Sequence, residues 1–135
     1  MRLALRLSVP ALVLAVAAPA SAGDFLVLRQ DIAGARQALV GMLLYRERRG
    51  PEQQVLVKAS ADAVSARFAM LKAPTGRQRE FAELKSTWEA FKRTRETELV
   101  PAILANDREK YERVAAGIQK ERLERMYALI DLLEK

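Results

Sequence analysis

The apolar residues of this chain recur at alternating steps of three and four positions. Such heptad spacing indicates a helix that packs lengthwise against other helices. Between residues 24 and 49 the repeat is formed by Phe25, Leu28, Ile32, Ala35, Leu39 and Met42. No segment shows the period-two alternation of a half-buried strand, so the spacing predicts an all-α fold.

Turn signals divide the chain after residue 22 into four helical segments, at about residues 24–49, 51–72, 76–105 and 107–135. Helices of similar length joined by short loops favour antiparallel neighbours. The sequence therefore predicts one domain, residues 23–135, folded as an up-down-up-down antiparallel four-helix bundle.

The three later segments each have an apolar stripe that predicts the buried face of the helix. The second has Val57, Val64, Phe68 and Leu71, widened by Ala59, Ala63, Ala66 and Met70. The third has Phe81, Leu84, Trp88 and Phe91. The fourth has Tyr111, Val114 and Ile118, followed after a one-residue shift by Leu123, Met126, Ile130 and Leu133. A helix whose stripe shifts can contact two neighbours.

Polar residues near the turns predict where two of the helices begin. Thr75 with Gln78, and Asn106 with Glu109, have the spacing of a capping box. Pro101 lies inside the pattern of the third segment. Because proline removes one backbone donor, we expect that helix to kink or restart there.

The first 22 residues have the features of a secretory signal peptide. Arg2 and Arg6 precede an apolar stretch at residues 7–18, and Ala20-Ser21-Ala22 is a cleavage site that would leave Gly23 as the new N-terminus. The sequence predicts a periplasmic protein. The alternative is an uncleaved N-terminal helix that anchors the domain to the inner membrane.

Cysteine and histidine are both absent from the sequence. Disulfides, thiolate nucleophiles, Cys/His zinc sites and His-ligated haem are therefore excluded. No acid lies on a seam where burial would suit it to catalysis, so we predict a protein that is not an enzyme and has no metal or cofactor. The alternative of an enzyme or electron carrier lacks the histidine and cysteine side chains that commonly bind a metal or haem.

The formal net charge falls from +6 to +4 when Arg2 and Arg6 leave with the signal. Acidic and basic residues are mixed along the helices, which is typical of solvated faces. An exported chain without a basic stripe is not expected to bind nucleic acid. A small anionic ligand remains compatible with the mildly basic balance.

The second half of the chain has four short runs of residues that together resemble a known family. They are Phe81-Ala82-Glu83-Leu84, Trp88-Glu89-Ala90-Phe91, Leu104-Ala105-Asn106-Asp107 and Leu129-Ile130-Asp131-Leu132-Leu133. This pattern resembles the second helical hairpin of the four-helix-bundle sensory domain of methyl-accepting chemotaxis proteins. The first two segments fit that domain in layout but carry no motif of it.

The resemblance implies a periplasmic ligand-binding domain, homodimeric, that passes binding to a membrane receptor or kinase. The chain ends at Lys135, about where the family's second membrane helix would begin, so we expect a free-standing domain. Its expected function is non-catalytic binding of a small, anionic ligand or of a membrane partner. The alternative is a structural, interaction or chaperone-like helical bundle of the cell envelope.

Three arginines are the candidate ligand-binding residues. Arg95 takes the next heptad place after Phe91, where a half-buried guanidinium could hold a carboxylate or phosphate. Arg46 and Arg49 follow the first seam and predict a basic mouth at the end of the bundle that bears the first and third turns. The alternatives are an Arg95 that reaches water or pairs with Asp62, and end arginines that favour the helix dipole.

Overall fold

The structure is a computed structural model that describes residues 22–135. The predicted signal peptide lies outside the described residues, except for Ala22, where the first helix begins. The described chain is all-helical, without strands, and forms four helical rods. This confirms the prediction of an all-α fold with four helical segments. None of the described helices is both long and apolar enough to cross a membrane.

The four rods are built from six α-helices and one π-helical turn, and a 3₁₀ turn lies between the first two rods. The first two rods are α1 (Ala22–Leu44) and α2 (Pro51–Met70), with a 3₁₀ turn, η1 (Arg46–Arg48), between them. The third rod is α3 (Gln78–Thr94), a π-helical turn, η2 (Arg95–Leu99), and α4 (Val100–Leu104). The fourth rod is α5 (Arg108–Ala116) and α6 (Ile118–Leu133).

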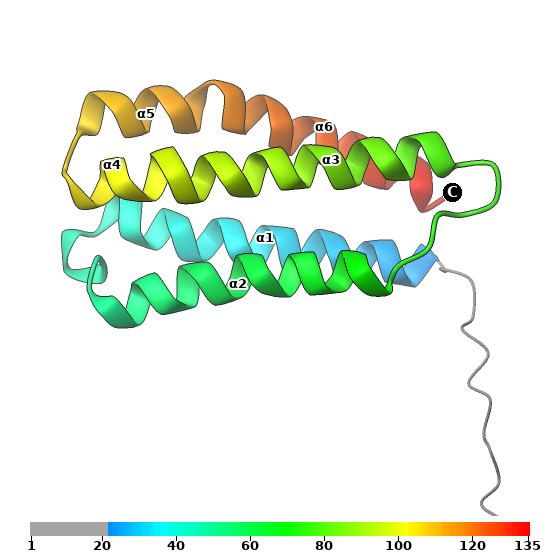
Figure 1. Cartoon of the computed structure of the whole chain (residues 1–135), viewed down its shortest axis with the longest axis horizontal. Coiled ribbons are helices and arrows are strands. Elements are labelled where there is room, and N and C mark those ends of the chain that lie inside the picture. Colours follow the sequence, from blue (N-terminus) through cyan, green and yellow to red (C-terminus); the bar gives the residue numbers. More distant parts are fainter. Residues whose placement is uncertain (1–21) are drawn as a thin grey trace, which may run out of the picture.

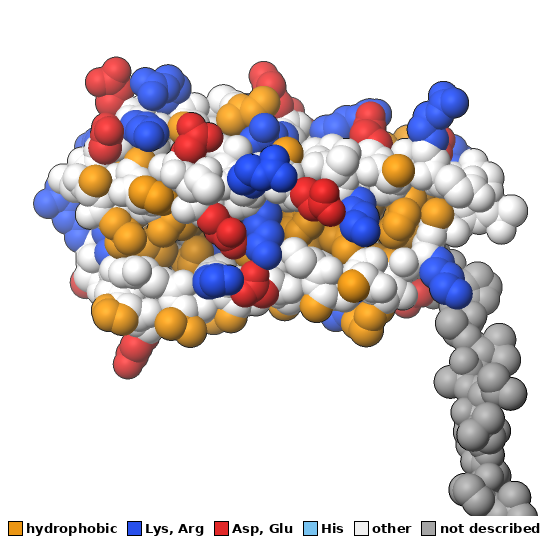
Figure 2. All heavy atoms as spheres, in the orientation of Figure 1, with side chains coloured by type: hydrophobic (Ala, Val, Ile, Leu, Met, Phe, Trp, Pro, Cys, Tyr) orange, Lys and Arg blue, Asp and Glu red, His pale blue; other side chains and the backbone are white. Residues whose placement is uncertain are grey.

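The rods lie lengthwise beside one another (Figure 1). The most extensive packing is α1 against α2 and α3 against α6, and α1 also touches α6. Acidic and basic side chains are mixed over the visible face of the molecule (Figure 2). That face therefore carries no basic stripe of the kind that nucleic-acid binding requires.

The hydrophobic core consists of two clusters along the rods. The long core cluster lies nearer the start of α1 and the C-terminus. It contains Phe25, Leu28, Ile32, Ala35, Ala61, Val64, Phe68, Leu84, Trp88, Phe91, Met126, Leu129, Ile130 and Leu133. The short core cluster lies nearer the α1–α2 turn and contains Leu39, Met42, Val57, Leu99, Ala102, Ile103 and Tyr111. All six residues of the predicted first seam are buried, which confirms the heptad reading.

The predicted stripes of the second and fourth segments are wrong at their margins. Met70 is 71% exposed and Ile118 is 43% exposed. The alanines that were expected to widen the second stripe, Ala59, Ala63 and Ala66, are exposed as well. The reason is that α2 packs extensively against α1 alone, so it buries a narrow face. Ile118 follows a break in the fourth rod that turns Gln119 inward instead.

Neither predicted capping box is formed. Arg77, and not Thr75, precedes α3, and its side chain makes no capping hydrogen bond. At the start of α5 the cap is Asp107, whose carboxylate accepts a hydrogen bond from the Lys110 amide at 3.2 Å. Asn106 instead takes a positive φ of 54°, a conformation that commonly ends a helix. The cap therefore moves one residue along the chain.

The predicted irregularity in the third rod is present. It is the π-helical turn η2, which begins at Arg95 and ends two residues before Pro101. A π turn is wider than an α turn and occurs mostly as a single turn inside an α-helix. The extra width lies where Pro101 cannot donate a backbone hydrogen bond.

The break between α5 and α6 occurs at Gly117, which has φ −96° and ψ −110°. A Cβ atom at this position would lie 2.8 Å from the carbonyl oxygen of Arg113, closer than real Cβ contacts allow. Glycine is therefore required by the close approach of the backbone. Gly34 in α1 differs, because a Cβ built there meets no atom within 4 Å beyond its chain neighbours and the backbone of its own helix.

We expect Gly117→Ala to destabilise the protein by about 1–3 kcal/mol, because the methyl group clashes with the Arg113 carbonyl. The matched control is Gly34→Ala, expected to stabilise by about 0.5–1 kcal/mol because alanine favours an exposed helix. Urea denaturation of the two variants measures both values. Equal stability changes in the two variants would contradict the role given to Gly117.

Candidate functional site

Arg95 is fully buried, which confirms that its heptad position lies on the seam. It begins η2 and extends its guanidinium between the first two rods. Its Nη1 donates to the carbonyl oxygen of Ala35 at 2.7 Å, and its Nη2 donates to that of Val57 at 2.8 Å. One side chain of the third rod is thus hydrogen-bonded to both α1 and α2.

The suggested pair between Arg95 and Asp62 is wrong. The Asp62 carboxylate accepts hydrogen bonds from Lys92 at 2.7 Å and from Lys58 at 2.9 Å. These two ammonium groups lower the pKa of Asp62. Asp62 is half-buried on the side of α2 that faces α3, so its carboxylate meets Lys92 on α3 and not the interior guanidinium.

The positive charge of Arg95 has no carboxylate partner within ion-pair distance in residues 22–135. Its Nε also lacks an acceptor there. Burial lowers the pKa of Arg95 to about 10, while nearby Glu96 opposes that shift. The group is still protonated at neutral pH. Carbonyl dipoles therefore compensate the charge in place of a counterion, an unusual arrangement for a buried cation.

Two polar side chains of α6 in the fourth rod are hydrogen-bonded to the third rod just before Arg95. Buried Gln119 donates from Nε2 to the carbonyl oxygen of Phe91 at 2.9 Å. Arg122 donates from Nη1 to Thr94 Oγ1 at 2.7 Å and to Gln119 Oε1 at 3.0 Å. We call Arg95, Thr94, Gln119 and Arg122 the polar layer. It lies between Phe91 of the long core cluster and Leu99 of the short one.

Sequence reasoning missed Gln119 and Arg122. A usable signal was present, since Gln119 stands seven residues before buried Met126 and thus on the same heptad position. The inward turn of Gln119 depends on the Gly117 break. That break is a backbone geometry which a regular helical pattern does not contain.

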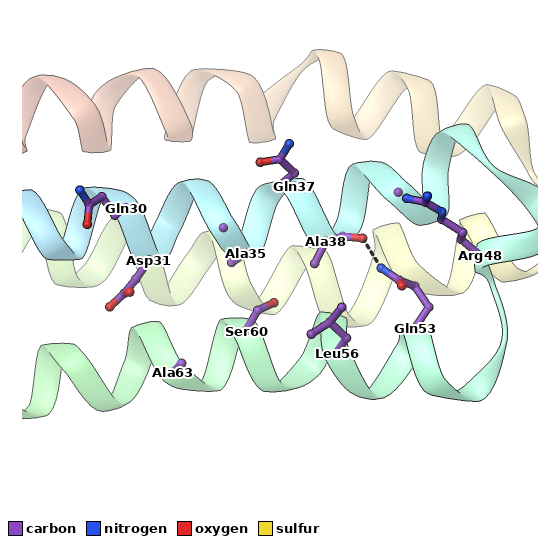
Figure 3. Close-up of a pocket in the computed structure, with 12 residues that line it drawn as sticks. Gln30, Asp31, Ala35, Gln37, Ala38, Arg48, Gln53, Leu56, Ser60 and Ala63 are labelled. Carbon is purple, nitrogen blue, oxygen red and sulfur yellow. Dashed lines mark hydrogen bonds between the residues drawn. The ribbon is translucent and has the colours of Figure 1, made fainter.

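A groove of about 550 Å³ runs between α1 and α2 (Figure 3). Small residues leave this space open, and the amides of Gln30, Gln37 and Gln53 contribute polar atoms to its lining. Gln53 is fixed by a hydrogen bond from its Nε2 to the Ala38 carbonyl oxygen at 2.9 Å. At one end Arg48 lines the groove, close to the backbone of Gly41.

Arg95 lies beneath this groove and is separated from it by a single layer of residues. Ala35 and Ser60 line the groove and are also hydrogen-bond partners of the guanidinium, Ser60 Oγ at 3.4 Å. A molecule in the groove would not touch Arg95 unless α1 and α2 separated. Ligand binding by Arg95 therefore stays a prediction, and the contacts of its side chain in this structure are structural ones.

Arg46 and Arg49 lie together just beyond the C-terminal end of α1, in a pocket of about 300 Å³ that we call the end pocket. It is formed where the α1–α2 turn meets the α4–α5 turn, which are the first and third turns of the chain. The other polar residues that line it are Asn106, Arg108, Tyr111 and Glu112. Arg95 is not part of it, so the structure brings together two of the three predicted arginines.

Arg49 is fixed in place by backbone carbonyls. Its Nε donates to Met42 O at 2.8 Å and its Nη2 to Leu43 O at 3.2 Å, near the C-terminal end of α1. Its Nη1 donates to Ile103 O at 3.1 Å, across in α4. These bonds satisfy carbonyls that a helix end leaves without partners. The Arg49 side chain therefore connects α1 of the first rod with α4 of the third rod, and its charge lies at the end pocket.

The remaining charges of the end pocket leave it net positive. Arg108 Nε is 2.8 Å from Glu112 Oε1, and this carboxylate raises the pKa of Arg108. Across residues 22–135, neither Arg46 nor Arg49 has a carboxylate within ion-pair distance. Sequence reasoning did not include Arg108, because nothing in a linear pattern shows which turns meet.

The described residues hold no group of three or more acidic, cysteine or histidine side chains that could bind a metal ion. The end pocket has three guanidinium groups, an amide, a phenol hydroxyl and the Glu112 carboxylate, which is paired with Arg108. This set can bind an anion and orient it by hydrogen bonds. No nucleophile with an adjacent base lies in its lining.

We expect Arg95→Met to leave the free energy of unfolding within about 1 kcal/mol of the parent or to raise it, because an apolar side chain of similar length removes a desolvated charge. Arg95→Ala should cost about 3 kcal/mol through the cavity it leaves. Because the pKa of about 10 lies below that of a free arginine, the charge destabilises the fold throughout pH 6–8. Denaturant titrations should therefore give the same difference in the free energy of unfolding between Arg95→Met and the parent at every pH in that range. A Met variant as unstable as the Ala variant would show that the guanidinium hydrogen bonds outweigh its desolvation.

No protein-family model, curated protein or solved structure matches this chain. The similarity of residues 81–133 to the chemoreceptor sensory domain therefore stays a prediction from sequence.

Proposed function

We propose that this protein is a non-catalytic, exported helical domain that binds a small organic anion in the end pocket. One observation carries the proposal: Arg46, Arg49 and Arg108 line one pocket that contains a single carboxylate, that of Glu112. Because Glu112 pairs with Arg108, the charges of Arg46 and Arg49 are left to attract an anion.

The shape and chemistry of the end pocket suit a small carboxylic acid. Its volume of about 300 Å³ is at the lower limit for small-molecule sites. Arg49 is held in one orientation by its three carbonyl partners, so little side-chain entropy is lost when an anion binds. Arg46 is exposed and can close over a ligand from the η1 turn.

The wider proposal follows the resemblance of residues 81–133 to chemoreceptor sensory domains. It comprises an up-down-up-down antiparallel four-helix bundle, a cleaved signal peptide and a periplasmic location. It also comprises a homodimer that reports binding to a membrane receptor or kinase. Support comes from the four packed helical rods and from the position of the end pocket at the first and third turns.

A second candidate function is that of an interaction module. α2 exposes Val55 (68%) and Met70 (71%), with exposed alanines between them along the helix, and Leu56 (53%) is exposed beside the α1–α2 groove. A contiguous apolar surface of this kind marks many protein–protein contacts. This reading requires a partner for α2 and no ligand in the end pocket.

We expect small carboxylates to raise the melting temperature of the purified protein. A ligand at 100 times its Kd stabilises the folded state by about 2.7 kcal/mol. A thermal-shift screen of amino, dicarboxylic and aromatic acids at low salt makes the test. Arg46→Glu should weaken binding about tenfold, because it replaces an attracting charge with a repelling one. Salt at 0.5 M should weaken it further by screening.

The matched control for this test is Arg93→Glu. Arg93 is exposed on α3, has the same charge and lines none of the three pockets described. Arg49 is unsuitable as the test residue, because its loss would also free the carbonyls of α1 and α4. A flat screen from folded protein, or equal effects of the two charge reversals, would refute anion binding in the end pocket and favour the α2 interaction surface.

A further inference from the structure

A second pocket, of about 670 Å³, lies between α1 and the fourth rod, and we call it the apolar groove. Its lining is dominated by the apolar side chains of Leu39, Val40, Leu43, Phe91, Leu99 and Leu123. Leu39 and Leu99 belong to the short core cluster, and Phe91 belongs to the long one. The groove therefore reaches the core where the two clusters meet.

The groove is open because the fourth rod presents small residues where it passes α1. Ala115 and Ala116 line the groove directly before the Gly117 break. α1 packs against α6 but makes no comparable contact with α5. The space is thus a consequence of alanines and a broken helix, and no side chain among residues 22–135 fills it.

The apolar groove and the end pocket are neighbours. Leu43 and Glu112 line both of them. On the groove side of this boundary the lining is mainly apolar, and on the other side it contains Arg46, Arg49 and Arg108. Two more cations, Arg36 and Lys120, also line the groove and are exposed. An apolar channel therefore leads to a cluster of positive charge.

We propose that the two spaces form one site for a single-chain anionic amphiphile, with its alkyl chain in the apolar groove and its carboxylate or phosphate in the end pocket. This inference rests on the proposed anion binding and names the ligand class. The charge arrangement carries it, because a neutral amphiphile gains nothing from the three arginines and a short anion leaves the groove empty. Burying each methylene of the chain tightens binding roughly fourfold.

The protein contains its own reporter for occupation of the groove. Trp88 is the only tryptophan of the chain. Its ring packs on Phe91, with centroids 5.7 Å apart, and Phe91 lines the groove. An alkyl chain that displaces water from Phe91 changes the surroundings of the Trp88 indole. Tryptophan fluorescence should therefore respond to long-chain acids and not to short acids.

The experiment titrates purified protein with butanoate, octanoate, decanoate and laurate below their critical micelle concentrations. Calorimetry and Trp88 fluorescence measure Kd. We expect roughly fourfold tightening per methylene until the groove is filled, and weaker binding of dodecyl maltoside, which has the chain without the charge. Dodecyl phosphate in a parallel titration distinguishes a phosphate head from a carboxylate head.

Two variants separate the parts of the site. Ala116→Phe should fill the groove and abolish the dependence of Kd on alkyl-chain length. The control is Ala82→Phe, at an exposed alanine of α3 that lines none of the three pockets described. Arg46→Glu should weaken the binding of laurate and of butanoate by the same factor. Equal Kd values for butanoate and laurate, or no effect of Ala116→Phe on laurate binding, would refute the proposed amphiphile site but not the proposed anion binding in the end pocket. Absence of binding by every acid would overturn both.

Discussion

The arrangement of the rods depends on one side chain that crosses from the third rod to the first two. Arg95 donates to carbonyl oxygens of both α1 and α2, and it does so from a fully buried position. The other polar links between α2 and the third rod include the Asp62–Lys92 ion pair at 2.7 Å and a hydrogen bond from Trp88 Nε1 to Ser65 Oγ at 3.0 Å. A buried cation is costly, so its two carbonyl partners specify one relative height for the three rods. A polar residue in a helical seam commonly fixes register in this way at the expense of stability.

The heptad pattern predicted the core well because burial in a helical bundle follows spacing. Every predicted residue of the first seam is buried, as are Trp88 and Phe91. Errors arise where the backbone departs from a regular helix. Ile118 was assigned to the core because its spacing fits an unbroken helix, and the break at Gly117 exposes it. The capping errors have a similar cause, since Asn106 takes a left-handed conformation that its residue type allows but does not require.

The candidate site was predictable only in part. Heptad counting placed Arg46 and Arg49 at the end of the molecule where the first and third turns lie, and it placed Arg95 on the seam. Counting along separate helices does not give distances between helices, so it missed Arg108 and suggested a partner for Arg95 that lies elsewhere. The apolar groove could not be predicted from the sequence for the same reason, because it lies between residues of separate helices. It exists because α5 carries alanines at the point where it passes α1.

The division of the core into two clusters bears on how the molecule opens. A polar layer between the clusters interrupts the continuous apolar contact that makes a small domain unfold as one unit. The short core cluster has half as many buried residues as the long one, seven against fourteen. Amide protons around it are therefore expected to exchange through openings of lower free energy than those around Trp88. The end that carries the arginines is then the more easily opened half, so the proposed anion site lies in the part of the fold with the lower cost of local unfolding.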